Sequence, residues 1–305
     1  MKTKIPKAEP REQTVAAAAP KPPFPPKKLD KPGVEADLEP KPKFRGEKYR
    51  AAGKLEGKVA LITGGDSGIG RAVAVFFARE KADVVINHLP EEQEDADATK
   101  QEIEALGQRC VAIAGDLTDP NTCSRLIEQT IEEFGRLDIL VSNAAHQNRK
   151  PSIDEISEEE WDRTFKTNVY APFHLIKAAL PHLKEGASII ITSSETGLFG
   201  NKQLLDYSST KGALNAFVKS LAQNLVEKGI RVNAVAPGPV WTPLNPADTG
   251  LPAEKLKEFG KKTPMGRPGQ PEEMAPAYVF FASDADSSYI TGHVLPLLGG
   301  EVAGA

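Results

Sequence analysis

Cysteine, net charge and long apolar runs are all scarce in this 305-residue sequence. Its two cysteines, Cys110 and Cys123, are too few for a disulfide framework and fit a reducing compartment. A net charge of −4 gives no electrostatic reason to bind nucleic acid or an anionic membrane. No apolar run reaches the roughly 18–20 residues that span a bilayer, and "VAAAA" near the N-terminus is shorter than the about 7–15 residues of a secretory core. We therefore expect a cytoplasmic protein that binds neither nucleic acid nor membranes.

Proline is concentrated at one end of the sequence. Ten of the 25 prolines precede residue 43, where they exclude α-helix and central β-strand. We divide the chain into an extension rich in proline and lysine, residues 1–53, and a folded domain, residues 54–305. The extension is interpreted as a disordered or polyproline-like tail, as a ligand for a proline-binding module, or as an arm over the folded body or a neighbouring subunit. The residues that would anchor such an arm are Phe24, Leu29, Leu38 and Phe44.

From residue 54 onward, apolar segments of six or seven residues alternate with longer amphipathic segments. The apolar segments predict buried strands at 58–63, 82–87, 109–115, 137–143, 187–193, 230–236 and 291–297. The amphipathic segments predict helices near 68–80, 92–106, 120–134, 158–183, 207–228 and 271–283. Strands that are separated by helices and buried on both faces indicate a parallel sheet between two helical layers. We predict an α/β fold with a single Rossmann-type, doubly wound sheet of about seven strands.

Four glycines separate the first predicted strand from the first predicted helix, in "ITGGDSGIGRA" at 62–72. Gly64, Gly68 and Gly70 form the pattern G-x-x-x-G-x-G. The free N–H groups at the start of the helix and the helix dipole attract a pyrophosphate. A β-carbon at Gly64 or Gly68 would block its close approach. Gly70 would permit close packing of the helix against the strand. A P-loop needs G-K-[S/T], whereas Gly70 is followed by Arg71. The stretch predicts a dinucleotide site rather than phosphoryl transfer; the alternative is a merely tight turn.

A tyrosine and a lysine lie four residues apart at the start of the helix predicted near 207–228. Tyr207 and Lys211 therefore project from one helix face. A phenol has a reference pKa of about 10, and a nearby ammonium would lower this pKa toward the range that acid–base catalysis needs. Ser194 lies thirteen residues upstream, at the end of the strand predicted at 187–193. The pattern indicates a proton-transfer site; an ordinary helix-surface pair is the alternative.

In the glycine pattern and in Ser194, Tyr207 and Lys211, the chain from about 54 to 300 resembles the classical short-chain dehydrogenase/reductases. The matching motifs occur in the expected order: "TGGDSGIG" (63–70), "GDL" (115–117), "SNAA" (142–145), "TNV" (167–169), "TSS" (192–194), "YSSTK" (207–211) and "PGPVWT" (237–242). The proline-rich leader is similar to that of a bacterial branch of general stress proteins and aldehyde reductases. The resemblance implies an NAD(P)-dependent oxidoreductase that moves a hydride between nicotinamide and a carbonyl or alcohol substrate. A glucose-type sugar dehydrogenase and a non-catalytic dinucleotide-binding stress protein are the alternatives.

The resemblance also implies a catalytic set of four residues. Tyr207 would give or take the proton at the substrate oxygen, and Ser194 would hydrogen-bond the same oxygen as charge develops. Lys211 would lower the pKa of the phenol and hold the nicotinamide ribose. Asn168 would hold a water that links the lysine to solvent, or would satisfy a local bond in its helix.

A second set of residues is implied to contact the dinucleotide. Asp116 would contact the adenine amine or cap the helix after the third strand. Asn143 would tie the central strands together, and Thr242 would contact the nicotinamide carboxamide. The whole predicted set is Gly64, Asp66, Ser67, Gly68, Ile69, Gly70, Asn87, His88, Asp116, Leu117, Asn143, Ala144, Tyr207, Lys211, Pro237, Gly238, Val240 and Thr242.

The choice between NAD and NADP depends on the end of the second predicted strand. An acid about 20 residues past the glycines would bind the ribose hydroxyls and repel a 2′-phosphate. Asn87 and His88 stand there instead, without an arginine fork beside them. The cofactor is therefore expected to be NADP or NAD, with the choice open.

The substrate pocket and the assembly are less defined by the sequence. The long segment 243–271 is rich in Gly and Pro and is expected to form a lid. Phe199, His146 and Trp241 are candidate pocket residues, each equally consistent with plain packing. No His/Cys cluster has metal-ligand spacing, so we expect chemistry without a metal. The resemblance implies a homotetramer that acts on a small carbonyl or alcohol.

Overall fold

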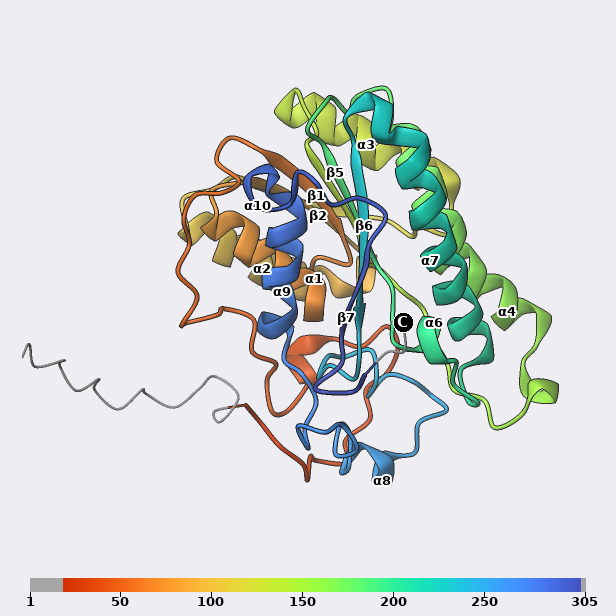
Figure 1. The fold of residues 1–305 in the computed structure, drawn as a ribbon. Coiled ribbons are helices and arrows are strands. Elements are labelled where there is room, and N and C mark those ends of the chain that lie inside the picture. The colour runs from red at the N-terminus through yellow and green to blue at the C-terminus, as the bar shows by residue number, and fades with distance from the viewer. Residues whose placement is uncertain (1–18, 303–305) are drawn as a thin grey trace, which may run out of the picture.

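A sheet of seven parallel strands forms the centre of the computed structural model, which describes residues 19–302 (Figure 1). The strand order is β3-β2-β1-β4-β5-β6-β7, so the order reverses between β1 and β4. In open sheets of this kind, ligands bind at the carboxyl ends of the strands beside that reversal. The strands are β1 (Val59–Thr63), β2 (Asp83–His88), β3 (Cys110–Ala114), β4 (Ile139–Ser142), β5 (Ser188–Thr192), β6 (Arg231–Pro237) and β7 (Val294–Leu297).

Helices cover both faces of the sheet, as Figure 1 shows. Alternation along each strand supplies both cores: in β1, Ala60 and Ile62 pack with α1, α2 and α9, whereas Leu61 packs with α3, α5 and α7. The predicted doubly wound fold is therefore confirmed. The α-helices are α1 (Gly68–Arg79), α2 (Gln93–Ala105), α3 (Pro120–Phe134), α4 (Glu158–Phe165), α5 (Ala171–Ala179), α6 (Thr196–Phe199), α7 (Leu205–Leu225), α8 (Ala253–Leu256), α9 (Pro271–Ala282) and α10 (Asp284–Ser287).

The single helix predicted over 158–183 is wrong in detail. A π-helical segment, Lys166–Tyr170, separates α4 from α5. Asn168, in this segment, has a buried side chain that forms hydrogen bonds with the main chain of His146 and with the Thr210 hydroxyl. A π-helical turn inside a helix is commonly found at functional sites, and hydrophobic periodicity alone does not reveal one.

The proline-rich extension lies against the body over the part that the structure describes, residues 19–53; residues 1–18 lie outside it. Phe24 and Leu38 are buried in a small cluster with Trp241, and Leu29 packs against that cluster. The Phe24 and Trp241 rings stack with centroids 4.2 Å apart. Phe44 packs against the main core. We call residues 19–53 the arm; the domain boundary at 53/54 stays a prediction.

Residues 19–302 contain neither a membrane-spanning helix nor a metal-binding cluster. No helix there combines the length and apolar character that crossing a bilayer requires. Within the same residues, no three His, Cys, Asp or Glu side chains gather in a way that could hold a metal ion. Both cysteines are free and buried.

Candidate active site

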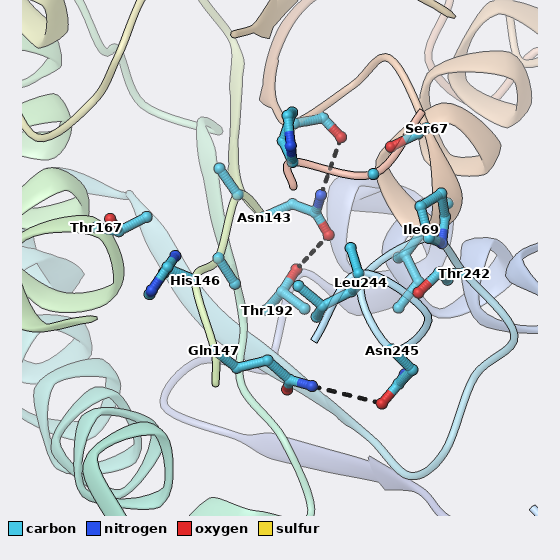
Figure 2. Close-up of a pocket in the computed structure, with 18 of the residues that line it drawn as sticks. Ser67, Ile69, Asn143, His146, Gln147, Thr167, Thr192, Thr242, Leu244 and Asn245 are labelled. Carbon is cyan, nitrogen blue, oxygen red and sulfur yellow. Dashed lines mark hydrogen bonds between the residues drawn. The ribbon is translucent and has the colours of Figure 1, made fainter. Parts of the chain in front are cut away.

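One pocket of about 910 Å³ opens at the carboxyl ends of the strands (Figure 2). Its size lies near the top of the usual range for small-molecule sites, about 300–1,000 Å³. The strand order places the segments after β2 and β3 at one end of the pocket, which we call the β2–β3 end. The segments after β4, β5 and β6 lie at the opposite end, which we call the β4–β6 end. Of the predicted site residues, Gly70 and Asn168 do not line the pocket. Those that line it are Gly64, Asp66, Ser67, Gly68, Ile69, Asn87, His88, Asp116, Leu117, Asn143, Ala144, Ser194, Tyr207, Lys211, Pro237, Gly238, Val240 and Thr242.

The glycine loop, residues 64–70, makes the sharp turn from β1 into α1. Gly64 and Gly68 adopt left-handed backbone angles, with φ of +60° and +51°. An added β-carbon at Gly70 would lie 1.8 Å from the carbonyl oxygen of Gly64, so the loop and the helix can approach this closely only with glycine there. Because α1 begins at Gly68, the N–H groups of its first turn lack partners within the helix. This bare, donor-rich turn fits the pyrophosphate of a dinucleotide.

One of these N–H groups binds an acid from the arm. Gly68 N donates to Glu35 Oε2 at 2.6 Å, and Arg71 Nη1 donates to Glu35 Oε1 at 2.7 Å. Arg71 also contacts Asp95 Oδ1 at 3.3 Å and donates through Nε to the main-chain oxygen of Asp66. Burial raises the pKa of Glu35 to about 6, although the Arg71 guanidinium opposes this shift. Sequence reasoning missed Glu35, because no motif links the proline-rich arm to the glycine loop.

At the β2–β3 end, the predicted residues are held by the backbone around them. Asn87 and His88 are both 2% exposed, and Asn87 Nδ2 donates to the carbonyl oxygen of Gly115 at 3.0 Å. Asp116 accepts a hydrogen bond from the N–H two residues later. The suggestion that Asp116 caps the next helix is wrong, because Asp119 is the N-cap of α3.

Asn143 ties three strands together beneath the pocket (Figure 2). Its Nδ2 donates to the carbonyl oxygens of Thr63 and Gly64 at 3.1 and 3.2 Å, and its Oδ1 accepts from Thr192 Oγ1 at 3.1 Å. The side chain therefore links the ends of β1, β4 and β5. This fixes the glycine loop relative to the end of β5, which carries the next group of residues.

Tyr207 and Ser194 meet at the end of β5. Tyr207 lies in the first turn of α7, and the Ser194 side chain acts on its hydroxyl to lower the pKa of the phenol. Lys211, one turn further along α7, donates from Nζ to the main-chain oxygen of Thr192 at 2.7 Å. The same Nζ lies 5.3 Å from the centroid of the Tyr207 ring. The structure thus gathers the predicted tyrosine, lysine and serine in one place.

The pKa of the Tyr207 phenol is raised, whereas the neighbouring lysine was expected to lower it. Burial raises the pKa of Tyr207 to about 12, against smaller opposing effects of the Ser194 side chain and the Arg149 charge. Burial also lowers the pKa of Lys211 to about 7. Desolvation is the largest cause of both shifts, so the phenol is held in its neutral, proton-carrying form. The expectation of a lowered phenol pKa is therefore wrong for this arrangement.

Asn168 is fixed from the π-helical segment. Its Oδ1 accepts from His146 N at 2.8 Å, and its Nδ2 donates to His146 O at 2.9 Å and to Thr210 Oγ1 at 3.1 Å. Thr210 is the neighbour of Lys211 on α7. Asn168 therefore connects the segment after β4 to α7, one residue away from the lysine.

The lid predicted over 243–271 is tied to the arm. The N–H groups of Phe24 and Leu29 donate to the carbonyl oxygens of Lys257 and Pro246, at 3.1 and 3.2 Å. Trp241 Nε1 donates to the main-chain oxygen of Pro40 at 2.7 Å. Figure 2 shows Thr242 beside Ile69, at the start of this segment. Arm and lid are thus connected by main-chain hydrogen bonds, and Trp241, two residues before the lid, stacks on Phe24 of the arm.

The β4–β6 end is lined mainly by polar and charged side chains. Lys31 reaches it from the arm, and its Nζ donates to the main-chain oxygen of Gln147 at 2.8 Å. Of the three candidate pocket residues, only His146 lines the pocket: Phe199 is half exposed outside it, and Trp241 is buried against the arm. The polar lining includes Lys31, His146, Asn148, Arg149, Glu160, Arg163, Asn201 and Asn245.

Known proteins resemble this chain over most of its length. Residues 64–301 match a family model described as Enoyl-(Acyl carrier protein) reductase. The uncharacterized oxidoreductase YhdF of Bacillus subtilis is 54% identical, over 88% of this chain and 92% of its own. NADPH-dependent aldehyde reductase 1, chloroplastic, of Arabidopsis thaliana is 48% identical, over 90% and 96%. Glucose and ribitol dehydrogenase homolog 2 of the same plant is 46% identical, over 92% and 99%.

Solved structures share the fold. A short chain dehydrogenase from Burkholderia cenocepacia J2315 in complex with NADP superimposes with a TM-score of 0.74 at 34% identity, covering 81% of this chain and 98% of its own. A 3-ketoacyl-(acyl-carrier-protein) reductase from Brucella melitensis complexed with NADH gives a TM-score of 0.71 at 32% identity, with the same coverage.

Proposed function

The chain belongs to the short-chain dehydrogenase/reductase family of oxidoreductases, and we propose that it reduces the carbonyl group of a polar aldehyde or ketone with NAD(P)H. One observation carries this proposal. The buried Tyr207 and Ser194 side chains line the same pocket that is bounded by the glycine loop. A proton donor and a site for a dinucleotide therefore share one cavity.

The dinucleotide is proposed to lie along the carboxyl ends of the strands. The N–H groups of the glycine loop that Glu35 does not occupy would hold the pyrophosphate, because Gly64 and Gly68 line the pocket without side chains. Asp116 and Leu117 would border the adenine, and Thr242 would border the nicotinamide. When bound, the reduced cofactor supplies the hydride.

Tyr207 is proposed to donate its proton to the substrate oxygen. Its raised pKa, about 12, keeps the phenol protonated at neutral pH, which suits carbonyl reduction. Ser194 would donate a hydrogen bond to the same oxygen while negative charge develops on it. Lys211, with a pKa of about 7, would stabilise the resulting phenolate when it is charged. Asn168 would position Lys211 through the neighbouring Thr210.

The substrate is proposed to be polar. An ion pair between Arg149 and Asp248 and a hydrogen bond between His146 and Glu160 lie beside the polar β4–β6 end. Hydroxyl groups on a substrate would find both donors and acceptors in this lining. The same feature supports a second candidate, the oxidation of a sugar or polyol, as in the name of the Arabidopsis glucose and ribitol dehydrogenase homolog.

The test is a panel of small aldehydes, ketones, sugars and polyols, each with both nicotinamide cofactors, followed by nicotinamide absorbance. Turnover of carbonyls with reduced cofactor supports the main proposal, and turnover of sugars alone with oxidised cofactor supports the second. Tight dinucleotide binding without any turnover would indicate a binding protein and would overturn both.

Assembly and location complete the proposal. We propose a homotetramer, supported by the family and by exposed apolar side chains at Tyr170 and Phe173, beside the start of α5. Light scattering that gives a monomer mass would refute it. The two free cysteines support a cytoplasmic location, where a reducing poise keeps thiols unpaired.

A further inference from the structure

Lys31, in the arm, lines the β4–β6 end of the pocket and has hydrogen-bonding capacity to spare. Its Nζ donates to the main-chain oxygen of Gln147 at 2.8 Å, and the side chain forms no ion pair within residues 19–302. The two acids that attract it most, Glu160 and Asp248, are hydrogen-bonded to other side chains. A lysine nitrogen has more than one hydrogen to donate, so Lys31 can bind a ligand and keep its contact with Gln147.

The backbone on both sides of Lys31 is held against the body. The N–H of Leu29 donates to a carbonyl oxygen of the lid at 3.2 Å, and the Glu35 carboxylate accepts from the glycine loop at 2.6 Å. Between them, Gly33 has a φ of +104°, and an added β-carbon there would lie 2.9 Å from the β-carbon of Ala247 in the lid. The arm therefore carries Lys31 to a fixed place in the pocket.

His146, beside Gln147 in the segment after β4, offers an acceptor next to this donor (Figure 2). Its Nε2 bonds Glu160 Oε1 at 2.9 Å, and because an ionised carboxylate only accepts, Nε2 carries the ring proton. Burial lowers the pKa of His146, and the Lys31 charge lowers this pKa further, so the ring is neutral at neutral pH. Nδ1 is then an acceptor, and no group within residues 19–302 donates to it.

Asn168 fixes His146 relative to the reacting groups. Its side chain bonds the N–H and the carbonyl oxygen of His146 at 2.8 and 2.9 Å, and the Thr210 hydroxyl at 3.1 Å. Thr210 and Tyr207 lie about one turn apart on α7. A small substrate whose oxygen meets Tyr207 can therefore extend within the same pocket toward His146 and Lys31.

We propose that Lys31 and His146 bind a hydroxyl group of the substrate, so that the chain prefers hydroxyaldehydes to aldehydes without a hydroxyl. The inference rests on the proposed function, because it names the substrate class of the same site. A hydroxyl both accepts and donates, so its oxygen meets Lys31 Nζ and its hydrogen meets His146 Nδ1. A carboxylate would satisfy Lys31 but would place a second acceptor against Nδ1. An aldehyde without the hydroxyl would displace water from both groups and replace neither hydrogen bond.

The experiment compares glyceraldehyde with propanal, which has the same three carbons and no hydroxyl. For the full-length protein with saturating reduced cofactor, we expect kcat/KM to favour glyceraldehyde at least about tenfold. Lys31→Met keeps most of the side chain but loses its donors, whereas His146→Gln keeps a donor for Glu160 but loses the Nδ1 acceptor. Each should lower the ratio of the two kcat/KM values about tenfold and leave propanal reduction within about twofold. Hydration of the aldehydes is the same for every variant and cancels when ratios are compared.

Matched controls are available on the arm and on the body. Lys27 donates to the main-chain oxygen of Asp37 at 2.9 Å outside the pocket, so Lys27→Met removes an arm hydrogen bond without touching the site. His182→Gln changes an exposed histidine that does not line the pocket. Both controls should keep the wild-type ratio.

The outcomes separate this inference from the function on which it rests. A wild-type ratio near one, or a ratio that neither Lys31→Met nor His146→Gln alters, overturns the inference and leaves carbonyl reduction standing. Failure of the wild-type protein to reduce any carbonyl compound overturns the proposed function, and the inference with it. If one of the two variants does not fold, the other variant and the wild-type ratio still decide.

Discussion

The carboxylate of Glu35 accepts a hydrogen bond from the main-chain N–H of Gly68 at 2.6 Å, across 33 residues of sequence. One partner comes from the proline-rich arm and the other from the glycine loop. The same carboxylate binds Arg71 of α1 at 2.7 Å. The arm and the glycine loop therefore form one structural unit, and a substitution in the arm should alter the stability of the loop.

Removing the Glu35 carboxylate should destabilise this unit. Glu35→Ala leaves Gly68 N without its acceptor and Arg71 with only part of its buried ion pairing, so we expect a loss of about 3 kcal/mol in the free energy of unfolding. Urea denaturation measures it. The control is Glu39→Ala, on the same arm, whose carboxylate is exposed; equal midpoints for the two variants would contradict the coupling.

The linkage of arm to lid can be followed through Trp241, one of two tryptophans in the chain. In a Trp161→Phe background, Phe24→Ala removes the ring stacked on Trp241, and a buried Phe→Ala change costs about 3–5 kcal/mol. We expect Trp241 to become accessible to acrylamide, measured as fluorescence quenching. Phe199→Ala, which removes a half-exposed ring, should leave quenching low; low quenching in both variants would show that the arm does not cover the lid.

The glycine loop should not tolerate a side chain at position 70. Gly70→Ala places a β-carbon 1.8 Å from a carbonyl oxygen, so the loop must move, and we expect NADH binding to weaken at least about tenfold. Gly212→Ala, within α7, meets only an ordinary contact at 3.8 Å and serves as the matched helical control. Calorimetric titration compares the two; unchanged affinity in Gly70→Ala would place the pyrophosphate elsewhere.

Lys211 should make stability depend on pH in the alkaline range. Its pKa is about 7 when folded and near 10.5 when exposed, so between these values the unfolded chain binds the extra proton. Folding stability therefore rises with pH from about 7 to 10.5, by at most about 5 kcal/mol for a shift of this size. We expect the wild-type protein to gain stability over Lys211→Met in that window, measured by urea denaturation. A constant difference between them would show that the buried lysine is charged throughout.

Repeated local patterns made much of the fold predictable. Apolar segments such as 58–63 indicated strands buried on both faces, and the glycines after that first segment indicated the tight turn into α1. Spacing also predicted that Tyr207 and Lys211 share a helix face, because residues four apart always do. These features depend on backbone geometry that neighbouring residues determine.

Features that depend on tertiary packing could not be predicted in this way. The contact of Glu35 with Gly68 joins two segments without any shared pattern. The raised pKa of Tyr207 follows from burial, whereas spacing suggested only the attraction of a lysine.

Single-turnover hydride transfer in Tyr207→Phe tests the central claim, that the Tyr207 phenol supplies the proton in the redox step. The variant keeps the ring but loses the hydroxyl, so we expect the rate of NAD(P)H oxidation by a carbonyl substrate to fall about a thousandfold while dinucleotide affinity is retained. Tyr289→Phe, at a fully exposed tyrosine, should behave as wild type. A wild-type rate in Tyr207→Phe would contradict the account.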